Sequence, residues 1–295
     1  MSTNEKQKLP LKLRMLRTTF KSVGAISPRL AGRLAFELFQ IPLNPSPVKE
    51  NQALMRTAQR TQIPFGKGHL ATYRWQGDGP AVLLVHGWET NASRWLPAVA
   101  ALRQADFDVI AFDAPAHGHS SGRKLPFDQY ARAIGAVVDH YPGITALIAH
   151  SFGVVGSAFY LTNGASPAIQ QAVFVGGPNR ALDALTGFAA ILGLSARSQA
   201  HIIRNLERRM GVPAEQVSVG YTMREHPLPA LIVHDRDDAI VPYEAALNIK
   251  AGWPRATLLT TAGLGHRRIL ADGEVLADIV AYLQAGKREP AGLAA

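Results

Sequence analysis

Apolar runs and amphipathic segments alternate along most of the chain from about residue 69 onward. Several runs are almost uninterrupted, such as Ala81-Val82-Leu83-Leu84-Val85, which is typical of parallel strands buried on both faces. The segments between them carry apolar residues at helical spacing. The expected strands are 69–75, 81–86, 107–112, 145–150, 171–176, 229–234 and 256–261, and the expected helices are 92–104, 127–140, 152–163, 243–252 and 273–285. This order predicts an α/β fold with a doubly wound, mostly parallel sheet of about eight strands.

One interval, residues 181–226, departs from this alternation. It contains helical, Arg-rich sequence between two expected strands. Connections in α/β domains are usually short, so an interval of this length predicts a small helical cap insertion over the sheet.

The N-terminal region has a third pattern. Apolar residues recur at helical spacing on both sides of Pro28, with Leu13, Leu16 and Phe20 before it and Leu30, Leu34 and Leu38 after it. This spacing predicts two amphipathic helices. Prolines at positions 42, 45 and 47 then predict a stiff linker.

Charge is concentrated in the same region. Residues 1–60 carry 11 Lys/Arg and 3 Asp/Glu, so that +8 of the formal net charge of +9 lies there. We therefore expect a basic helical arm with its linker over residues 1–60, and an α/β domain with the insertion over residues 61–295. The α/β domain lacks a basic stripe, which argues against a nucleic-acid partner. Two interpretations of the arm stay open: helices that pack on the main domain, or an element that contacts an anionic membrane surface through residues 10–40.

The residue types that are missing narrow the chemistry and the compartment. The chain has no cysteine, which excludes cysteine nucleophiles and thiolate metal sites. It has no apolar run of about 18 residues, so we expect no transmembrane helix. The first 30 residues lack the apolar stretch of a secretory signal. We expect a cytoplasmic protein, peripheral to the membrane if the arm binds lipid.

The segment Ala149-His150-Ser151-Phe152-Gly153 joins an expected strand to an expected helix. A serine at such a sharp turn is lifted out of the backbone, and small flanking residues let the strand and the helix approach closely. Ala149 stands where the usual pattern of this turn, Gly-x-Ser-x-Gly, has its first glycine. The alternative is a serine that only caps the helix.

Polar residues also follow the other expected strands, at what would be one edge of the sheet, where open parallel sheets bind their ligands. The chain order of the reactive types is serine, aspartate, histidine. The segments are His86-Gly87-Trp88, Asp113 to Ser120, Ser151, Asp235 to Pro242, and Gly265-His266.

This set of segments resembles the α/β-hydrolase family over residues of about 65 to 286. His86-Gly87-Trp88 is similar to the family's His-Gly-x oxyanion segment, and Asp113 to Ser120 to its Asp-x-Pro-Gly-x-Gly-x-Ser segment, with Ala116 in place of the first glycine. Asp235 to Pro242 resembles its acid loop, which assigns the acid to Asp238 and leaves Asp237 as the rival. Gly265-His266 resembles the pair that carries the general base.

The resemblance implies a role for each residue. Ser151 would be the nucleophile, His266 the general base, and Asp238 the acid that orients the imidazole. The backbone N–H groups of Trp88 and Phe152 would form the oxyanion hole. His117 and His119 are close enough in sequence to suggest zinc, but no glutamate is placed with them, and we expect neither a metal nor a cofactor.

A serine nucleophile points to acyl transfer rather than to the reactions of this family that use an aspartate as the nucleophile. The default is hydrolysis of small to medium carboxylic esters, with Trp88, Phe188 and Leu192 expected to contact the substrate. Thioester hydrolysis, perhydrolysis and acyl transfer to an alcohol use the same residues, and a ligand-binding protein with little turnover could keep the same fold. The sequence leaves the oligomeric state open.

Overall fold

The structure is a computed structural model that describes residues 11–286. Its contacts divide the chain into two compact units. The helical unit contains the described residues up to Gln40 together with Ala181–Val217, and the sheet unit contains Ile41–Arg180 together with the described residues from Ser218 onward. This grouping differs from the expected division into residues 1–60 and 61–295, because the arm and the insertion bury apolar faces against each other.

The sheet unit is built on one eight-stranded sheet in the order β1-β2-β4-β3-β5-β6-β7-β8. Strands β3 to β8 run parallel, and β2 is antiparallel to both β1 and β4. The predicted α/β class and the mostly parallel sheet are confirmed. The strands are β1 (Gln59–Phe65), β2 (Gly68–Trp75), β3 (Ala81–Val85), β4 (Asp108–Phe112), β5 (Ile144–His150), β6 (Gln171–Val175), β7 (Ala230–Asp235) and β8 (Ala256–Thr261).

Strand β1 has no counterpart among the strand ranges expected from the sequence. Its sequence is QRTQIPF, and only Ile63 is buried. An edge strand pairs on one side only, so its side chains need not be apolar. The apolar runs that mark the inner strands are therefore absent from β1.

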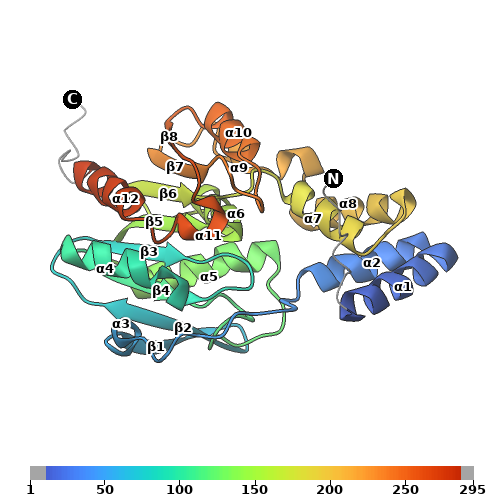
Figure 1. The fold of residues 1–295 in the computed structure, drawn as a ribbon, viewed down its shortest axis with the longest axis horizontal. Helices are drawn as coiled ribbons and strands as arrows, with labels where there is room; N and C mark the ends of the chain where they lie inside the picture. The colour runs from blue at the N-terminus through green and yellow to red at the C-terminus, as the bar shows by residue number, and fades with distance from the viewer. Residues whose placement is uncertain (1–10, 287–295) are drawn as a thin grey trace, which may run out of the picture. The chain divides into compact units, whose positions relative to one another are not determined.

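Helices cover both faces of the sheet (Figure 1). Helices α4 (Leu96–Gln104) and α12 (Gly273–Gly286) pack together on one face, where Val82, Leu84 and Val109 point into the same apolar cluster. Helices α5 (Phe127–His140) and α6 (Phe152–Thr162) pack against each other on the opposite face. The shorter helices of this unit are α3 (Ala53–Arg56), η1 (Ala92–Trp95), α9 (Val219–Thr222), α10 (Glu244–Gly252) and α11 (Gly265–Arg268).

The helical unit joins the arm to the insertion. Helix α2 (Pro28–Phe39) packs along α8 (Ala196–Met210), and α1 (Leu11–Ile26) packs on α2. Helix α2 buries Ala31, Ala35 and Phe36, while α8 buries Ile202 and Leu206. The unit is completed by α7 (Ala181–Ile191) and the short η2 (Ala214–Gln216). The arm therefore packs on the helices of the insertion.

The insertion ends earlier than residue 226, the boundary expected from the sequence. Residues from Ser218 onward belong to the sheet unit. The backbone N–H of Val219 donates to the Asn179 carbonyl at 2.7 Å, and that of Gly220 donates to Asn179 Oδ1 at 2.9 Å. Helix α9 also contacts α6 and α10. These contacts return the chain to the sheet unit before β7.

Candidate active site

Ser151 occupies the sharp turn between β5 and α6. Its backbone has φ 54° and ψ −126°, a conformation that costs a non-glycine residue roughly 1–3 kcal/mol. The turn is held on both sides: the Ser151 N–H donates to the Val175 carbonyl at 3.0 Å, and the Val154 N–H donates to the Ser151 carbonyl at 3.0 Å. The sharp strand-to-helix turn expected from the sequence is present, with Ser151 at the carboxyl end of β5.

The loop after β3 lies directly against this turn. A side-chain carbon on Gly87 would come within 2.8 Å of Ser151 Cβ, so only glycine allows this approach. Trp88 follows Gly87, and Phe152 is the first residue of α6. The rings of Trp88 and Phe152 meet edge to face, with centroids 5.4 Å apart. The two residues expected to supply the oxyanion hole are therefore in contact, one directly after Ser151 and the other directly after Gly87.

Asp238 and His266 form a direct hydrogen bond. The distance from His266 Nδ1 to Asp238 Oδ2 is 2.7 Å, and the other carboxylate oxygen accepts the backbone N–H groups of Ile240 and Val241 at 2.8 and 2.9 Å. Burial raises the pKa of Asp238, but these hydrogen bonds outweigh it and hold the pKa below its usual value. Asp237, the rival acid, is exposed, and its Oδ2 accepts the Gly263 N–H instead.

The pair meets the serine turn at the end of β6. Ser151 bonds to Val175, and the next residue, Gly176, lies against the pair: a Cβ there would sit 3.4 Å from His266 Nδ1 and 3.5 Å from Asp238 Oδ2. Within residues 11–286 the Ser151 hydroxyl makes no hydrogen bond. Contacts between nucleophile and base are often open without substrate.

Comparisons with known proteins identify the fold family. A family model described as alpha/beta hydrolase fold matches residues 80–190, and one described as TAP-like protein matches residues 210–294. The chain belongs to the α/β-hydrolase superfamily. The resemblance drawn from the motifs is confirmed.

Relatives of this hydrolase span most of its length. It is 27% identical to a non-heme chloroperoxidase of Burkholderia pyrrocinia, over 70% of this chain and 93% of that one. It is 25% identical to a pimeloyl-[acyl-carrier protein] methyl ester esterase of Nitrosomonas europaea, over 66% and 92%. The solved structure of the Pyrococcus furiosus esterase Pf2001 aligns with a TM-score of 0.62 at 20% identity, over 82% and 99%, a likeness of fold. The relatives' names support a hydrolase enzyme.

Two histidines fix the loops of the hydrolase around Ser151. His86 Nε2 accepts the Ala114 N–H at 2.9 Å and its Nδ1 donates to the Gly87 carbonyl at 2.7 Å. His117 Nε2 accepts the Glu89 N–H at 3.1 Å and its Nδ1 donates to the Pro115 carbonyl at 3.0 Å. Both rings use one nitrogen as an acceptor, which requires the neutral form. Burial lowers the pKa of each to about 4, which keeps them neutral.

A third histidine, His150, links the serine turn to the base. Its Nε2 donates to the His266 carbonyl at 2.9 Å, and the two rings lie 4.6 Å apart. Burial lowers the pKa of His150 to about 3. His150 is thus a positioning residue for the segment that carries His266.

Asp113 organises the loop after β4 and the start of η1. Its carboxylate accepts the N–H groups of Ala92 and His119, each at 2.8 Å, and the Tyr73 hydroxyl at 2.9 Å. Burial raises its pKa even though these hydrogen bonds act in the opposite direction. His119 also bonds to Tyr73 and pairs with Glu50. These contacts make Asp113 and His119 structural residues.

Phe188 and Leu192, two of the residues expected to contact substrate, belong to the helical unit. The Phe188 ring packs edge to face against Phe39, with centroids 5.5 Å apart. Leu192 has 0% exposure. A fully buried side chain offers no surface to a ligand, so the structure places Leu192 in the packing of the helical unit. The sequence showed that Leu192 is apolar but not what covers it.

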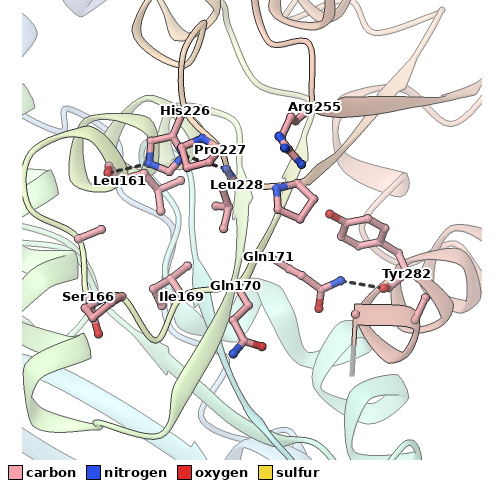
Figure 2. A pocket seen from close by; sticks show the side chains of 15 residues that line it. Leu161, Ser166, Ile169, Gln170, Gln171, His226, Pro227, Leu228, Arg255 and Tyr282 are labelled. Atoms are coloured by element: carbon pink, nitrogen blue, oxygen red, sulfur yellow. Dashed lines mark hydrogen bonds between the residues drawn. The ribbon is translucent and has the colours of Figure 1, made fainter. Parts of the chain in front are cut away.

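A cavity of about 760 Å³ lies at the opposite edge of the sheet (Figure 2). It is lined by residues at the amino ends of β6, β7 and β8, including Gln171, Pro229 and Arg255. Figure 2 shows Gln171 bonded to the Tyr282 carbonyl and His226 bonded to the Leu161 carbonyl. Because Ser151 follows the carboxyl end of β5, this cavity does not belong to the candidate active site.

Proposed function

We propose that this protein is a serine hydrolase that cleaves carboxylic esters through an acyl-serine intermediate. The observation that carries the proposal is the 2.7 Å hydrogen bond between His266 and Asp238 beside a serine in a strained strand-to-helix turn. The esterase named among the relatives supports the same class of reaction.

In the acylation step, Ser151 Oγ attacks the ester carbonyl while His266 Nε2 takes the hydroxyl proton. The carbon–oxygen bond of the leaving alkoxide then breaks, and the same proton is returned to it to give the alcohol. Water repeats the sequence on the acyl-serine and releases the acid. Asp238, which accepts from Nδ1, directs the free electron pair of Nε2 toward the serine and stabilises the imidazolium that forms.

The developing oxyanion would accept the backbone N–H groups of Trp88 and Phe152. Phe152 begins α6, so its N–H lies at the positive end of the helix dipole. Removal of one such donor costs roughly 3–4 kcal/mol of transition-state stabilisation. The close approach of Gly87 to Ser151 supports the position of the Trp88 donor.

Turnover of short-chain p-nitrophenyl esters tests the proposal. We expect Ser151→Ala to lower kcat by about 10⁴-fold or more. Ser157→Ala is the matched control, because Ser157 is a buried serine inside α6, the helix that begins directly after Ser151. Equal rates for Ser151→Ala and the parent protein would contradict the proposal.

Transfer of the acyl group to hydrogen peroxide is a second candidate, supported by the chloroperoxidase among the relatives. Peroxide would attack the acyl-serine in place of water and leave as a peracid. Peracid formation from acetate esters and peroxide, absent in Ser151→Ala, would show it. Thioester cleavage or transfer to an alcohol would appear as other acyl donors or acceptors in the same assay. A ligand-binding protein would show neither turnover nor a covalent adduct.

We also propose that the helical unit contacts anionic membrane surfaces. Four apolar side chains of α1 and α2 are exposed, Met15, Ile26, Leu30 and Leu34, although other residues of both helices are buried. Basic residues share these helices, including the exposed Arg14, Arg29 and Arg33. No helix within residues 11–286 has the length and apolar content needed to cross a bilayer. The proposed contact is therefore one of helices lying on the surface.

A further inference from the structure

A second pocket, of about 430 Å³, adjoins the candidate active site. Trp88, whose backbone is assigned to the oxyanion hole, lines it, and so does Arg267, which follows His266. The opposite wall comes from residues 44–49, which the sequence suggested were only a linker. The pocket thus shares Trp88 with the candidate active site and includes the residue that follows the proposed base.

The charged side chains that line this pocket are mostly cationic. They are Lys49, Arg94 and Arg267, with Glu89 as the only acid among the described residues of the lining. Nε of Arg94 is buried and has no hydrogen-bond partner among the described residues. Burial, and then repulsion from Arg267, lowers the pKa of Arg94. Neither arginine has an ion-pair partner in the part of the chain that the structure describes.

Among the described residues Glu89 forms no ion pair with either arginine, and one of its carboxylate oxygens is bonded to the backbone instead. Its Oε1 accepts the backbone N–H groups of Leu43 and Asn44 at 2.7 and 2.8 Å. The Ser46 N–H donates to the Glu89 carbonyl at 2.8 Å. Glu89 therefore fixes the wall of the pocket.

The rest of the wall is held by a hydrogen-bond network. Asn91 Nδ2 donates to the Ser46 carbonyl at 2.9 Å, and the Lys49 N–H donates to Ser93 Oγ at 3.1 Å. Asn91 Oδ1 accepts both the N–H and the hydroxyl of Ser93. This network fixes the backbone just before Arg94 without using its guanidinium.

We propose that Arg94 and Arg267 bind an anionic group of the substrate, a carboxylate or phosphate, beside the ester that reacts. Two guanidinium groups without a carboxylate partner match the planar, bidentate recognition of such anions. The proposal rests on the proposed esterase function and narrows its substrates to anionic esters. Lys49 adds a third positive charge at the rim.

Matched substrates test the proposal at constant ionic strength. The first pair varies the acyl side of the ester: monomethyl succinate carries a carboxylate where methyl levulinate carries a methyl ketone. The second pair varies the alcohol side in the same way, with the carboxylate in para-acetoxybenzoate and the methyl ketone in para-acetoxyacetophenone. We expect at least one anionic ester to be preferred in kcat/KM by roughly tenfold or more. Arg94→Gln and Arg267→Gln should each reduce that preference with little change for the neutral ester.

Arg132→Gln is the control, because Arg132 is an exposed arginine that pairs with Asp128 on α5. It should leave the preference unchanged. Titration of inorganic phosphate into Ser151→Ala by calorimetry asks whether the arginines bind an anion that is not part of an ester. We expect phosphate to bind to Ser151→Ala, and we expect this binding to be lost in the variant that also carries Arg94→Gln and Arg267→Gln.

The outcomes separate the two proposals. Ester turnover with no preference for either anionic ester, and no phosphate binding, would overturn the anion site and leave the esterase. Phosphate binding through the arginines with no turnover of any ester would support the site and overturn the esterase. A preference that survives both arginine substitutions would also overturn the assignment.

Discussion

The two units of this hydrolase use polar residues in opposite ways. In the sheet unit, ionisable side chains such as Asp113, His117 and Asp238 are buried and hydrogen-bonded at the edge of the sheet that carries Ser151. In the helical unit, the arginines of α8, such as Arg204 and Arg208, are exposed. Buried polar groups hold fixed positions because losing a partner is costly, whereas exposed ones adapt at little cost. The first arrangement suits catalysis, and the second suits contact with a variable surface.

The largest expected effect is a loss of kcat on substitution of the buried acid Asp238, compared with its exposed neighbour Asp237. Asp238→Asn should lower kcat by about 10⁴-fold, because the amide no longer holds His266 in the catalytic tautomer. Asp237→Asn should change it little, since Asp237 is exposed and bonds to Gly263. Steady-state kinetics on one ester measures both. Equal losses would contradict the assignment of the acid.

A second prediction concerns acid stability of the sheet unit. The folded-state pKa is about 4 for His86 and His117 and about 3 for His150, below the usual 6.5. As the pH falls, these histidines therefore become protonated in the unfolded chain at a higher pH than in the folded protein. The folded state keeps its full stability at neutral pH, and its free energy of unfolding decreases as the pH falls below about 6.5. Between about pH 7.5 and 5.5, we expect the free energy of unfolding to fall by roughly 1 kcal/mol for each histidine.

Urea unfolding at several pH values measures this loss. His150→Asn keeps a donor for the His266 carbonyl and should remove its share of the pH dependence. His140→Gln is the control, because His140 is exposed at the end of α5. A free energy of unfolding that stays constant over this pH range would show that the three histidines are not held neutral.

Substitution of Ala149, which packs at the end of β5 before the serine turn, should have a smaller effect on stability and activity. Ala149 has 0% exposure and pairs with Val85 and Phe174 on the neighbouring strands. Ala149→Val should destabilise the protein by about 1–3 kcal/mol through overpacking and disturb the turn, whereas Ala149→Gly should be tolerated. Chemical unfolding and ester kinetics test both. An Ala149→Val protein with unchanged stability and activity would rule out the tight packing proposed for the turn.

The smallest expected effect is that on membrane contact. We expect the intact protein to sediment with phosphatidylglycerol vesicles at low salt but not with phosphatidylcholine vesicles. Leu30→Ser with Leu34→Ser should weaken this binding, while Ile240→Ser, an exposed apolar residue of the sheet unit, should not. Binding that is unaffected by both salt and the leucine substitutions would exclude this role for the helical unit.

The sequence was sufficient to predict the elements whose residue types are tied to one structural environment. The inner strands are apolar because both faces are covered, and the reactive residues follow these strands in a recognisable order. Strand β1 escaped prediction because an exposed edge strand can be polar. The apolar stripe of α2 indicated a buried face, but not that α8 would cover it.

The arginine pocket could not be predicted because its members are distant in sequence. Arg94 follows β3, Arg267 follows β8, and Lys49 lies in a proline-rich segment. None of the three belongs to a motif that the sequence analysis identified. For Arg94 and Arg267, the signal that could have linked them to the site was their position after His86-Gly87-Trp88 and His266, a signal that Lys49 lacks.

The central claim is that Ser151 is the nucleophile, and covalent labelling tests it most directly. The folded protein is treated with a fluorophosphonate, digested and mapped by mass spectrometry, with Ser151→Ala and Ser157→Ala treated in parallel. We predict one adduct on Ser151 in the parent and in Ser157→Ala, and none in Ser151→Ala. A folded parent protein without an adduct on Ser151 would contradict the account.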